Sequence, residues 1–326
     1  MKVAFTICSN NYLGSAKVLV DSFKRFHPDF EVFIGLVDLP SDQVDYSALG
    51  CIVLPVTDVA MPDPRDLSQK FNIIELSTTA KPYYFQHFFF KLGATQAIYL
   101  DPDIEVFAPL AAVLHGLDTA MITLTPHMLT PVDDEFWPND KHILPTGVFN
   151  LGFVALALHP QLAFFLDWWA DRCFKYGYRN ANEGMFYDQI WMNYVPTFFE
   201  SYHIIRDPGY NVANWNLHER MLTRDAVGKW RVNQHAELVF FHFSHYNIGK
   251  PDTISSYHNR FTFSNRPDLL PLFTEYRRQV IDHRGEFLKT LAPHYGELHR
   301  QAQKPNFRSY RDLKHRALRR LRALLD

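Results

Sequence analysis

Ala97-Ile98-Tyr99-Leu100-Asp101-Pro102-Asp103-Ile104-Glu105-Val106 is the stretch from which the rest of the chain can be placed. Its first four residues form an apolar run typical of a buried strand, and two aspartates follow, separated by one residue. Carboxylates at alternate positions are costly to bury without partners, so we expect them to face a cleft, where their oxygens suit a hard divalent cation. The alternative is a solvent-exposed turn, because Asp-x-Asp is a short pattern that recurs by chance.

The segments before this stretch alternate between strand and helix patterns. Strand patterns occupy residues 3–8, 31–37 and 51–56, and a helical apolar period occupies residues 16–26. This alternation predicts an α/β fold with a mainly parallel central sheet. Ligands of such sheets bind beyond the carboxyl ends of the strands, where both Ser9-Asn10-Asn11 and Asp101-Pro102-Asp103 are expected. We therefore expect these two segments to converge on one crevice.

Composition restricts the class of protein. The 326 residues are 47% apolar and 15% aromatic, enough for a substantial core in one large domain or one domain with additions. The formal net charge of -2 gives no general attraction to nucleic acid. Cys8, Cys51 and Cys173 are scattered and lack the spacing of metal ligands, which favours a reducing compartment. Without a signal-peptide pattern or a membrane-spanning apolar run, we expect a cytoplasmic protein.

The middle of the chain contains three features that each permit two interpretations. Residues 69–91 are helical, with Pro82 expected in the first turn of a second helix; Lys81 is then either a surface lysine at that helix start or a functional cation. Residues 125–146 form a proline-rich, acidic loop, either a lid facing an acceptor or an exposed disordered loop. Within the strand of residues 149–158, Gly152 indicates close approach of another group or a β-bulge.

The later segments add further polar candidates. Asp188 and Gln189 should lie near the start of a helix that continues through Tyr194, where an aspartate is most often a cap. Residues 210–216 combine amides and aromatic rings, which suits sugar binding or a hydrogen-bonded structural loop. His242 lies in the apolar run of residues 238–243, where a core histidine is the ordinary interpretation; a second histidine, a glycine and a lysine soon follow.

From about residue 265 the sequence is helical and charged, and residues 304–326 form a basic amphipathic tail. We therefore divide the chain into residues 1–255 and a C-terminal helical extension, residues 256–326. The tail either contacts an anionic membrane surface peripherally, at the inner membrane face, or docks its leucines on the main domain.

In their order along the chain, these segments resemble glycosyltransferase family 8, over residues 1–255. That family contains glycogenin-like and bacterial lipopolysaccharide galactosyl- and glucosyltransferases with the GT-A fold. The fold is an α/β architecture with a mixed, mainly parallel central sheet. The segments that carry the resemblance are 6–14, Lys81, 101–103, 149–152, Asp188-Gln189, Tyr210-Asn211 and 242–251.

The resemblance implies a site that binds a nucleotide-sugar donor. Asp101, Asp103 and His242 would hold a Mn²⁺ or Mg²⁺ ion together with the donor diphosphate. Asp188 would accept a sugar hydroxyl, and Gln189 would lie close to the anomeric carbon, as the catalytic pair. Residues that would contact the donor are Thr6, Asn10, Asn11, Tyr12, Lys81, Asp101, Asn150, Gly152 and Lys250. The implied reaction retains the anomeric configuration and transfers a hexose, with UDP favoured, to a glycan, glycolipid or protein-linked acceptor.

Two departures from the family pattern bear on the metal site. Asp252 follows Lys250-Pro251 where the family usually has tryptophan or a similar residue, and His245 offers an alternative metal ligand to His242.

Three other functions compete with transfer. A nucleotidyltransferase would need a glycine-rich basic loop after the first strand, which residues 9–12 lack. A non-catalytic nucleotide-sugar-binding module would tolerate the loss of one acid. A nucleotide-sugar hydrolase would turn over without an acceptor.

Overall fold

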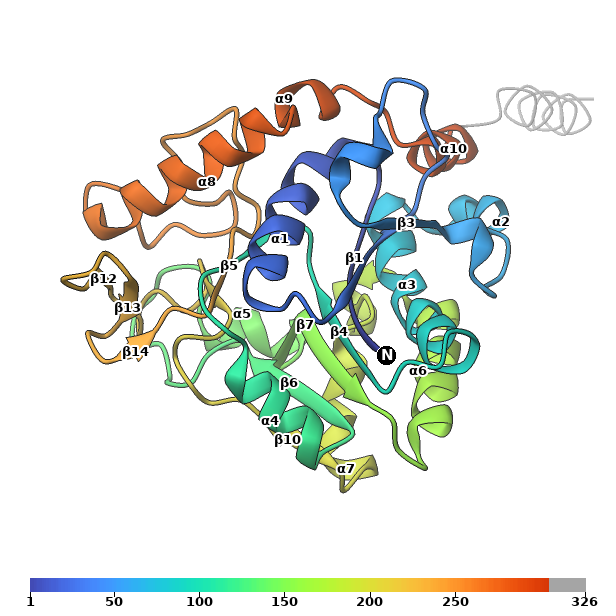
Figure 1. Ribbon diagram of the computed structural model, residues 1–326, viewed down its shortest axis with the longest axis horizontal. Coiled ribbons are helices and arrows are strands. Elements are labelled where there is room, and N and C mark those ends of the chain that lie inside the picture. Colours follow the sequence, from blue (N-terminus) through green and yellow to red (C-terminus); the bar gives the residue numbers. More distant parts are fainter. Residues whose placement is uncertain (305–326) are drawn as a thin grey trace, which may run out of the picture.

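The computed structural model describes residues 1–304, and a seven-stranded sheet forms its centre (Figure 1). The strand order is β10-β6-β7-β4-β1-β2-β3. Its strands are β1 (Lys2–Cys8), β2 (Glu31–Leu36), β3 (Ile52–Pro55), β4 (Gln96–Leu100), β6 (Ile122–Pro126), β7 (Phe149–Ala157) and β10 (Tyr202–Ile204). All neighbouring pairs are parallel except the two that involve β7. The predicted α/β fold with a mixed, mainly parallel sheet is confirmed.

Helices cover both faces of this sheet. α3 (Ile73–Gln86) and α6 (Leu162–Tyr176) pack on one face; α1 (Leu13–Phe26) and α4 (Ala111–Thr119) pack on the other. Neighbouring residues of β1 show the two-residue period that this requires, because Phe5 belongs to the core beneath α3 and Ala4 to the core beneath α1. Both faces are thereby buried, as parallel sheets require.

A second, three-stranded sheet begins directly after the Asp-x-Asp turn. It contains β5 (Ile104–Val106), β11 (Val212–Ala213) and β15 (Phe240–His242), in the order β11-β15-β5. β15 is antiparallel to β5, and His242 is paired with Ile104. This register places His242, from late in the chain, beside Asp101 and Asp103.

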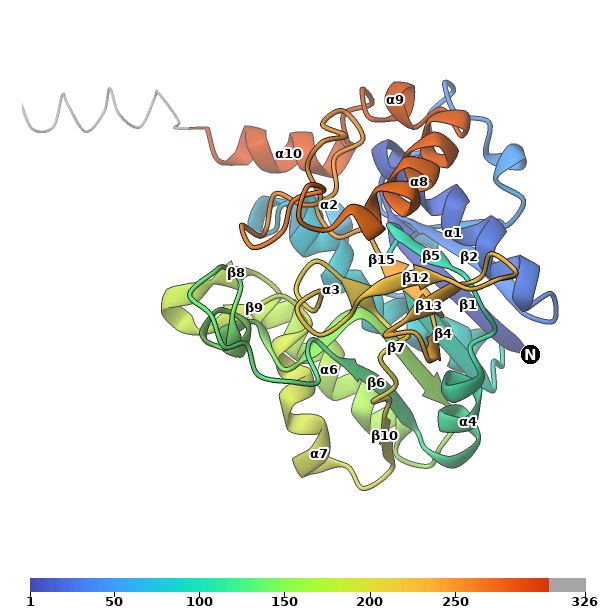
Figure 2. The same ribbon diagram turned by 90° about the vertical axis from the view of Figure 1, so that its left-hand side faces the viewer.

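The remaining elements surround these two sheets. The short helices are α2 (Pro64–Lys70), α5 (Asp140–Ile143), α7 (Val195–Phe198), α9 (Gly285–Leu288) and α10 (His294–Ala302). The outer strands are β8 (Arg179–Asn180), β9 (Met185–Phe186), β12 (Leu222–Arg224), β13 (Trp230–Val232) and β14 (Ala236–Glu237). α8 (Leu270–Asp282) lies beside α1 (Figure 2). The Tyr276 ring of α8 stacks on Phe243, with 3.7 Å between the ring centroids. The segment after residue 255 therefore shares a core with the one before it.

Helix α3 differs from the sequence prediction. We expected a break with Pro82 opening a new helix, but α3 runs through Pro82 from Ile73 to Gln86 and continues into a π-helical turn, His87–Lys91. Leu76 and Phe85, on either side of the proline, are buried in the same core beneath α6. Packing on both sides of Pro82 keeps the helix continuous despite the missing backbone donor.

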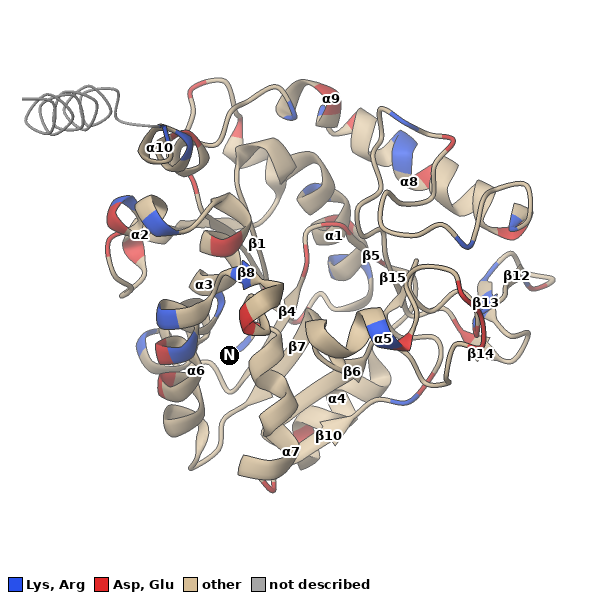
Figure 3. Ribbon diagram, turned by 180° about the vertical axis from the view of Figure 1, so that it is seen from behind, with Lys and Arg blue, Asp and Glu red and all other residues tan. Residues whose placement is uncertain are grey.

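Surface charge is mixed, and helices α2, α6 and α8 each carry both acidic and basic residues (Figure 3). None of the helices within residues 1–304 is long and apolar enough to cross a membrane. The basic tail predicted for residues 304–326 lies outside the described residues apart from Lys304. Its contact with a membrane stays a prediction, as does the domain boundary at residue 255.

Candidate active site

The side chains of Asp101, Asp103 and His242 converge at the junction of the two sheets. One ligand atom from each lies within 4.8 Å of the others. The Nε2 atom of His242 is 3.0 Å from Oδ1 of Asp103 and 3.6 Å from Oδ2 of Asp101. The imidazole is almost fully buried, whereas both carboxylates remain partly accessible to solvent. Two carboxylates and one imidazole form a donor set that suits a divalent cation.

Backbone pairing explains this convergence. Asp101 ends the pairing of β4 with β7 by donating its N–H to the carbonyl of Gly152 at 2.7 Å. The backbone carbonyl of Asp103 accepts from the N–H of Phe243 at 2.9 Å. The Asp-x-Asp turn is therefore fixed to β7 on one side and to the end of β15 on the other. The predicted cleft-facing turn is therefore held in place by strands far apart in sequence.

Gly152 leaves room for the His242 ring. A Cβ atom at this position would lie 2.7 Å from Nδ1 of His242 and 2.8 Å from the side-chain oxygen of Asn150. Of the two explanations predicted for a glycine in this strand, close approach of another group is therefore confirmed, and that group is the His242 ring.

Electrostatics link the cluster members. Burial alone would raise the pKa of Asp103, but the imidazole of His242 outweighs burial and holds that pKa below its ordinary value. Burial alone would lower the pKa of His242, and the carboxylates of Asp103 and Asp101 instead hold it above its ordinary value. Each group therefore favours the charged form of the other.

A buried ion pair lies beside this cluster. The ammonium of Lys81 is 2.6 Å from a carboxylate oxygen of Asp188, and it donates to the carbonyl of Leu151 at 2.8 Å. Burial raises the pKa of Asp188, an effect that the Lys81 ammonium opposes. The interpretation of Lys81 as a surface lysine is wrong, because α3 continues through Pro82 and buries it. The helix-cap interpretation of Asp188 gives way to this ion pair.

The amide of Gln189 is held by three hydrogen bonds. Its Oε1 accepts from the Leu151 N–H at 2.8 Å and from Nδ2 of Asn150 at 3.3 Å, and its Nε2 donates to the Thr146 carbonyl at 2.8 Å. Asn150 in turn accepts from Nδ2 of Asn211 at 3.1 Å. These partners orient Gln189 rigidly beside β7.

The N-terminal segment places its candidates at the carboxyl end of β1. Thr6 and Asn10 are buried, Asn11 is half-buried, and Tyr12 is exposed. Asn10 donates its backbone N–H to Asp38 at 3.1 Å, and its side chain bonds the Leu39 carbonyl and the Tyr46 hydroxyl. Asp38 also accepts from the backbone N–H of His294, the first residue of α10. Asp38 was missed in the sequence, although its place directly after an apolar strand was a usable signal.

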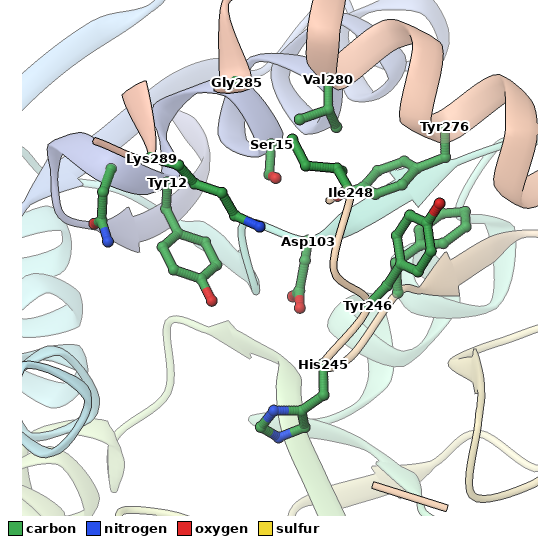
Figure 4. Close-up of a pocket in the computed structure, with 13 residues that line it drawn as sticks. Tyr12, Ser15, Asp103, His245, Tyr246, Ile248, Tyr276, Val280, Gly285 and Lys289 are labelled. Atoms are coloured by element: carbon green, nitrogen blue, oxygen red, sulfur yellow. The ribbon is translucent and has the colours of Figure 1, made fainter. Parts of the chain in front are cut away.

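One pocket joins this segment to Asp103 (Figure 4). Asn11 and Tyr12 line it together with Asp103, so the predicted convergence of the two strand ends is confirmed. Its remaining lining residues are Gly14, Ser15, Phe243, His245, Tyr246, Ile248, Tyr276, Val280, Gly285 and Lys289. Lys289, from the segment after residue 255, was missed because nothing in the local sequence distinguishes it from a surface lysine.

His245 and Lys250 take different positions. His245 lines the pocket in a left-handed backbone conformation, with φ of 57°, and its ring stacks on Tyr257 at 3.9 Å. It does not belong to the three-residue cluster that His242 completes. Lys250 is exposed and does not line the pocket.

Residues 210–216 form a structural loop. Asn211 and Asn216 are fully buried, and Asn216 donates to the carbonyls of His127 and Asn211, both at 2.9 Å. The hydrogen-bonded structural loop is therefore confirmed, and sugar binding by these residues stays a prediction.

The long loop of residues 125–146 is tied to later segments. Arg260 donates to both carboxylate oxygens of Asp134, at 2.7 and 2.8 Å, and also to the carbonyl of Pro138. Glu219 accepts from the backbone N–H groups of Leu129 and Thr130. These bonds do not fit an exposed disordered loop, and a role facing an acceptor stays a prediction.

Comparison with known proteins gives the following similarities. No family model matches the sequence. The uncharacterized protein YfnF of Bacillus subtilis strain 168 is 23% identical over 294 residues, covering 89% of this chain and 95% of YfnF. YfnD of the same organism is 25% identical over 249 residues, covering 74% of this chain and 77% of YfnD.

Among solved structures, galactosyltransferase LgtC, crystallised with donor and acceptor sugar analogues, is similar with a TM-score of 0.49 and 15% identity. The similarity covers 85% of this chain and 95% of LgtC. Glycosyltransferase GlyE of Streptococcus pneumoniae TIGR4 is similar with a TM-score of 0.48 and 13% identity, covering 88% of this chain and 64% of GlyE.

Proposed function

We propose that this chain is a metal-dependent, retaining glycosyltransferase of the GT-A type. It transfers a hexose from a nucleotide-diphosphate sugar, with UDP as the expected nucleotide, to a glycan, glycolipid or protein-linked acceptor. The observation that carries the proposal is the cluster of Asp101, Asp103 and His242 beside the pocket that Asn11 and Tyr12 line. The motif resemblance to glycosyltransferase family 8 supplies the reaction class.

The cluster fits a resident Mn²⁺ or Mg²⁺ ion. Its carboxylate oxygens and imidazole nitrogen are hard and intermediate donors, and both carboxylates remain open to solvent on one side. When bound, the cation supplies positive charge that stabilises the departing nucleoside diphosphate. Tyr99 orients Asp101 by donating its hydroxyl proton at 2.5 Å. We propose His242, and not His245, as the third ligand, because its Nε2 faces both carboxylates.

Asp188 and Gln189 are proposed to hold the donor sugar. Lys81 fixes the Asp188 carboxylate, which would accept a hydrogen bond from a sugar hydroxyl. The Gln189 oxygen already accepts two hydrogen bonds, which reduces its capacity to attack the anomeric carbon. This arrangement favours a same-face reaction through an ion-pair-like intermediate over a covalent glycosyl-Gln189 intermediate.

Calorimetry of nucleotide binding tests the metal site and the donor base together. UDP, GDP and dTDP would be titrated with and without Mn²⁺ into the wild-type chain and into Asp103→Ala. We expect Mn²⁺-dependent binding of one nucleotide and its loss, by about a hundredfold or more, in the variant, because the metal loses a ligand. The variant should melt near the wild-type temperature because Asp103 is partly exposed. Unchanged metal-dependent affinity in Asp103→Ala would overturn the site assignment.

A turnover assay separates transfer from hydrolysis. Donor consumption should rise when a sugar acceptor is added, whereas a nucleotide-sugar hydrolase would show equal rates with and without it. Proton NMR of the product should show the anomeric configuration of the donor; an inverted linkage would remove the same-face mechanism.

A further inference from the structure

Lys289 is the lysine that reaches the candidate donor pocket. It follows α9 directly, and it lines the pocket together with Asn11, Tyr12 and Asp103. In the close-up view its ammonium group points into the pocket between Tyr12 and Asp103 (Figure 4). The two sides of this pocket are therefore a carboxylate of the metal cluster and a cation from the C-terminal segment.

The position of Lys289 is fixed by close packing of two backbones. A Cβ atom at Gly14 would lie 2.7 Å from Cα of Gly285, so α9 approaches the start of α1 more closely than side chains would allow. The Lys289 N–H donates to the Gly285 carbonyl at 3.1 Å. The backbone that carries Lys289 is thereby docked on the loop that contains Asn11 and Tyr12.

The charge of Lys289 has no ionic partner within residues 1–304. Its ammonium donates to the side-chain oxygen of Asn247 at 2.9 Å, and that oxygen also accepts from the Gly249 N–H at 3.0 Å. Burial is the cause that lowers the pKa of Lys289, with no carboxylate opposing it. An ammonium that lines the pocket and is bonded only to a neutral amide is well placed to bind an anion.

We infer that Lys289 binds the diphosphate of the nucleotide-sugar donor, together with the metal ion. This inference rests on the proposed function. A divalent cation held by Asp101 and Asp103 would offset only part of the negative charge of the diphosphate, so a second positive group beside it would strengthen binding. Both lysines are exposed, but Lys250, which the motif resemblance assigns to this task, does not line the pocket, whereas Lys289 does. The C-terminal helical segment therefore completes the donor site.

Binding of nucleoside diphosphate to Lys289 variants tests the inference. Lys289→Gln removes the charge but keeps a hydrogen-bond donor for Asn247, and Lys289→Arg keeps the charge. In calorimetry with Mn²⁺ and the diphosphate that the wild-type chain binds best, we expect Lys289→Gln to weaken affinity about tenfold. Lys289→Arg should remain within about threefold of wild type. Lys229→Gln, at an exposed lysine of β13's hairpin, is the matched control and should bind normally.

A second probe removes the base from the measurement. Pyrophosphate with Mg²⁺ should show the same order of affinities, while binding of the corresponding nucleoside should be equal in all variants. If wild type and Lys289→Gln bind the diphosphate equally, the inference is wrong and the proposed function stands. If wild type shows no metal-dependent diphosphate binding, the proposed function fails, and the inference with it.

Discussion

The buried Lys81–Asp188 pair and the Asp101–Asp103–His242 cluster lie on either side of one residue, Tyr99, yet they differ in how their charges are satisfied. The Lys81 ammonium lies 4.2 Å from the centre of the Tyr99 ring, and the Tyr99 hydroxyl bonds Asp101. Lys81 and Asp188 are almost fully buried and neutralise each other. In the cluster, two partly exposed carboxylates share one imidazole.

This difference indicates a division of work within the site. The charges of Lys81 and Asp188 neutralise each other without a ligand, so folding itself fixes the groups on this side of Tyr99, which are proposed to hold the donor sugar. The cluster and its pocket carry charges that only a cation and a diphosphate would satisfy. A substitution on the Lys81 side should therefore reduce stability first, whereas a substitution beside the cluster should reduce metal-dependent binding.

Lys81→Met should produce the largest loss of stability. It leaves the Asp188 carboxylate buried without its cation, which costs about 3–5 kcal/mol in the free energy of unfolding. Urea denaturation at neutral pH measures this loss. Adding Asp188→Asn should recover part of it, because the stranded charge is removed.

The control for this prediction is an exposed ion pair. Lys175 and Asp171 are 2.7 Å apart on the surface of α6, and Lys175→Met should cost about 0–1 kcal/mol. A loss in Lys81→Met no larger than in Lys175→Met would mean that the buried pair is not the feature that distinguishes this side of the site.

The sequence predicted the parts of the site that follow local patterns. An apolar run ending in polar residues marked the carboxyl ends of β1 and β4, and the fold class followed from the strand and helix periods. Asn11 and Asp103 were thus expected in one crevice, and both line the same pocket, together with Tyr12.

The parts that sequence reasoning missed depend on packing between distant segments. The burial of Lys81 requires α3 to continue through a proline, which the core beneath α6 decides and local propensity does not. Asn211 lies in a polar segment of the sequence, but its side chain is fully buried and donates a hydrogen bond to Asn150. Lys289 reaches the pocket only because Gly14 and Gly285 allow their backbones to meet.

Gly152→Ala tests the contact between β7 and the cluster, with an intermediate expected effect. The added methyl group would meet the His242 ring, so we expect a stability loss of about 1–3 kcal/mol from overpacking. Metal-dependent nucleotide affinity should fall roughly tenfold as the imidazole is displaced. Gly296→Ala in α10, whose added methyl group would have ordinary contacts at 3.5 Å or more, is the control and should change neither quantity adversely. Wild-type affinity in Gly152→Ala would show that the position of His242 is not critical.

The smallest expected effect concerns His127, a buried residue that contacts Asn150 in the hydrogen-bond network around Gln189. Its Nε2 lies 3.3 Å from Nδ2 of Asn150, and burial lowers its pKa from 6.5 to about 4. Because the unfolded chain binds this proton more readily, the stabilisation is complete above about pH 6.5 and is lost as the pH falls toward 4. His127→Gln should therefore reduce the stability difference between pH 7 and pH 5 by about 1–2 kcal/mol. Urea denaturation at both pH values measures this, with His235→Gln, at an exposed histidine, as the control. If the difference in unfolding free energy between pH 7 and pH 5 is the same in His127→Gln as in wild type, the buried network around Gln189 tolerates a charged imidazole. That result would contradict the view that folding alone fixes this part of the site.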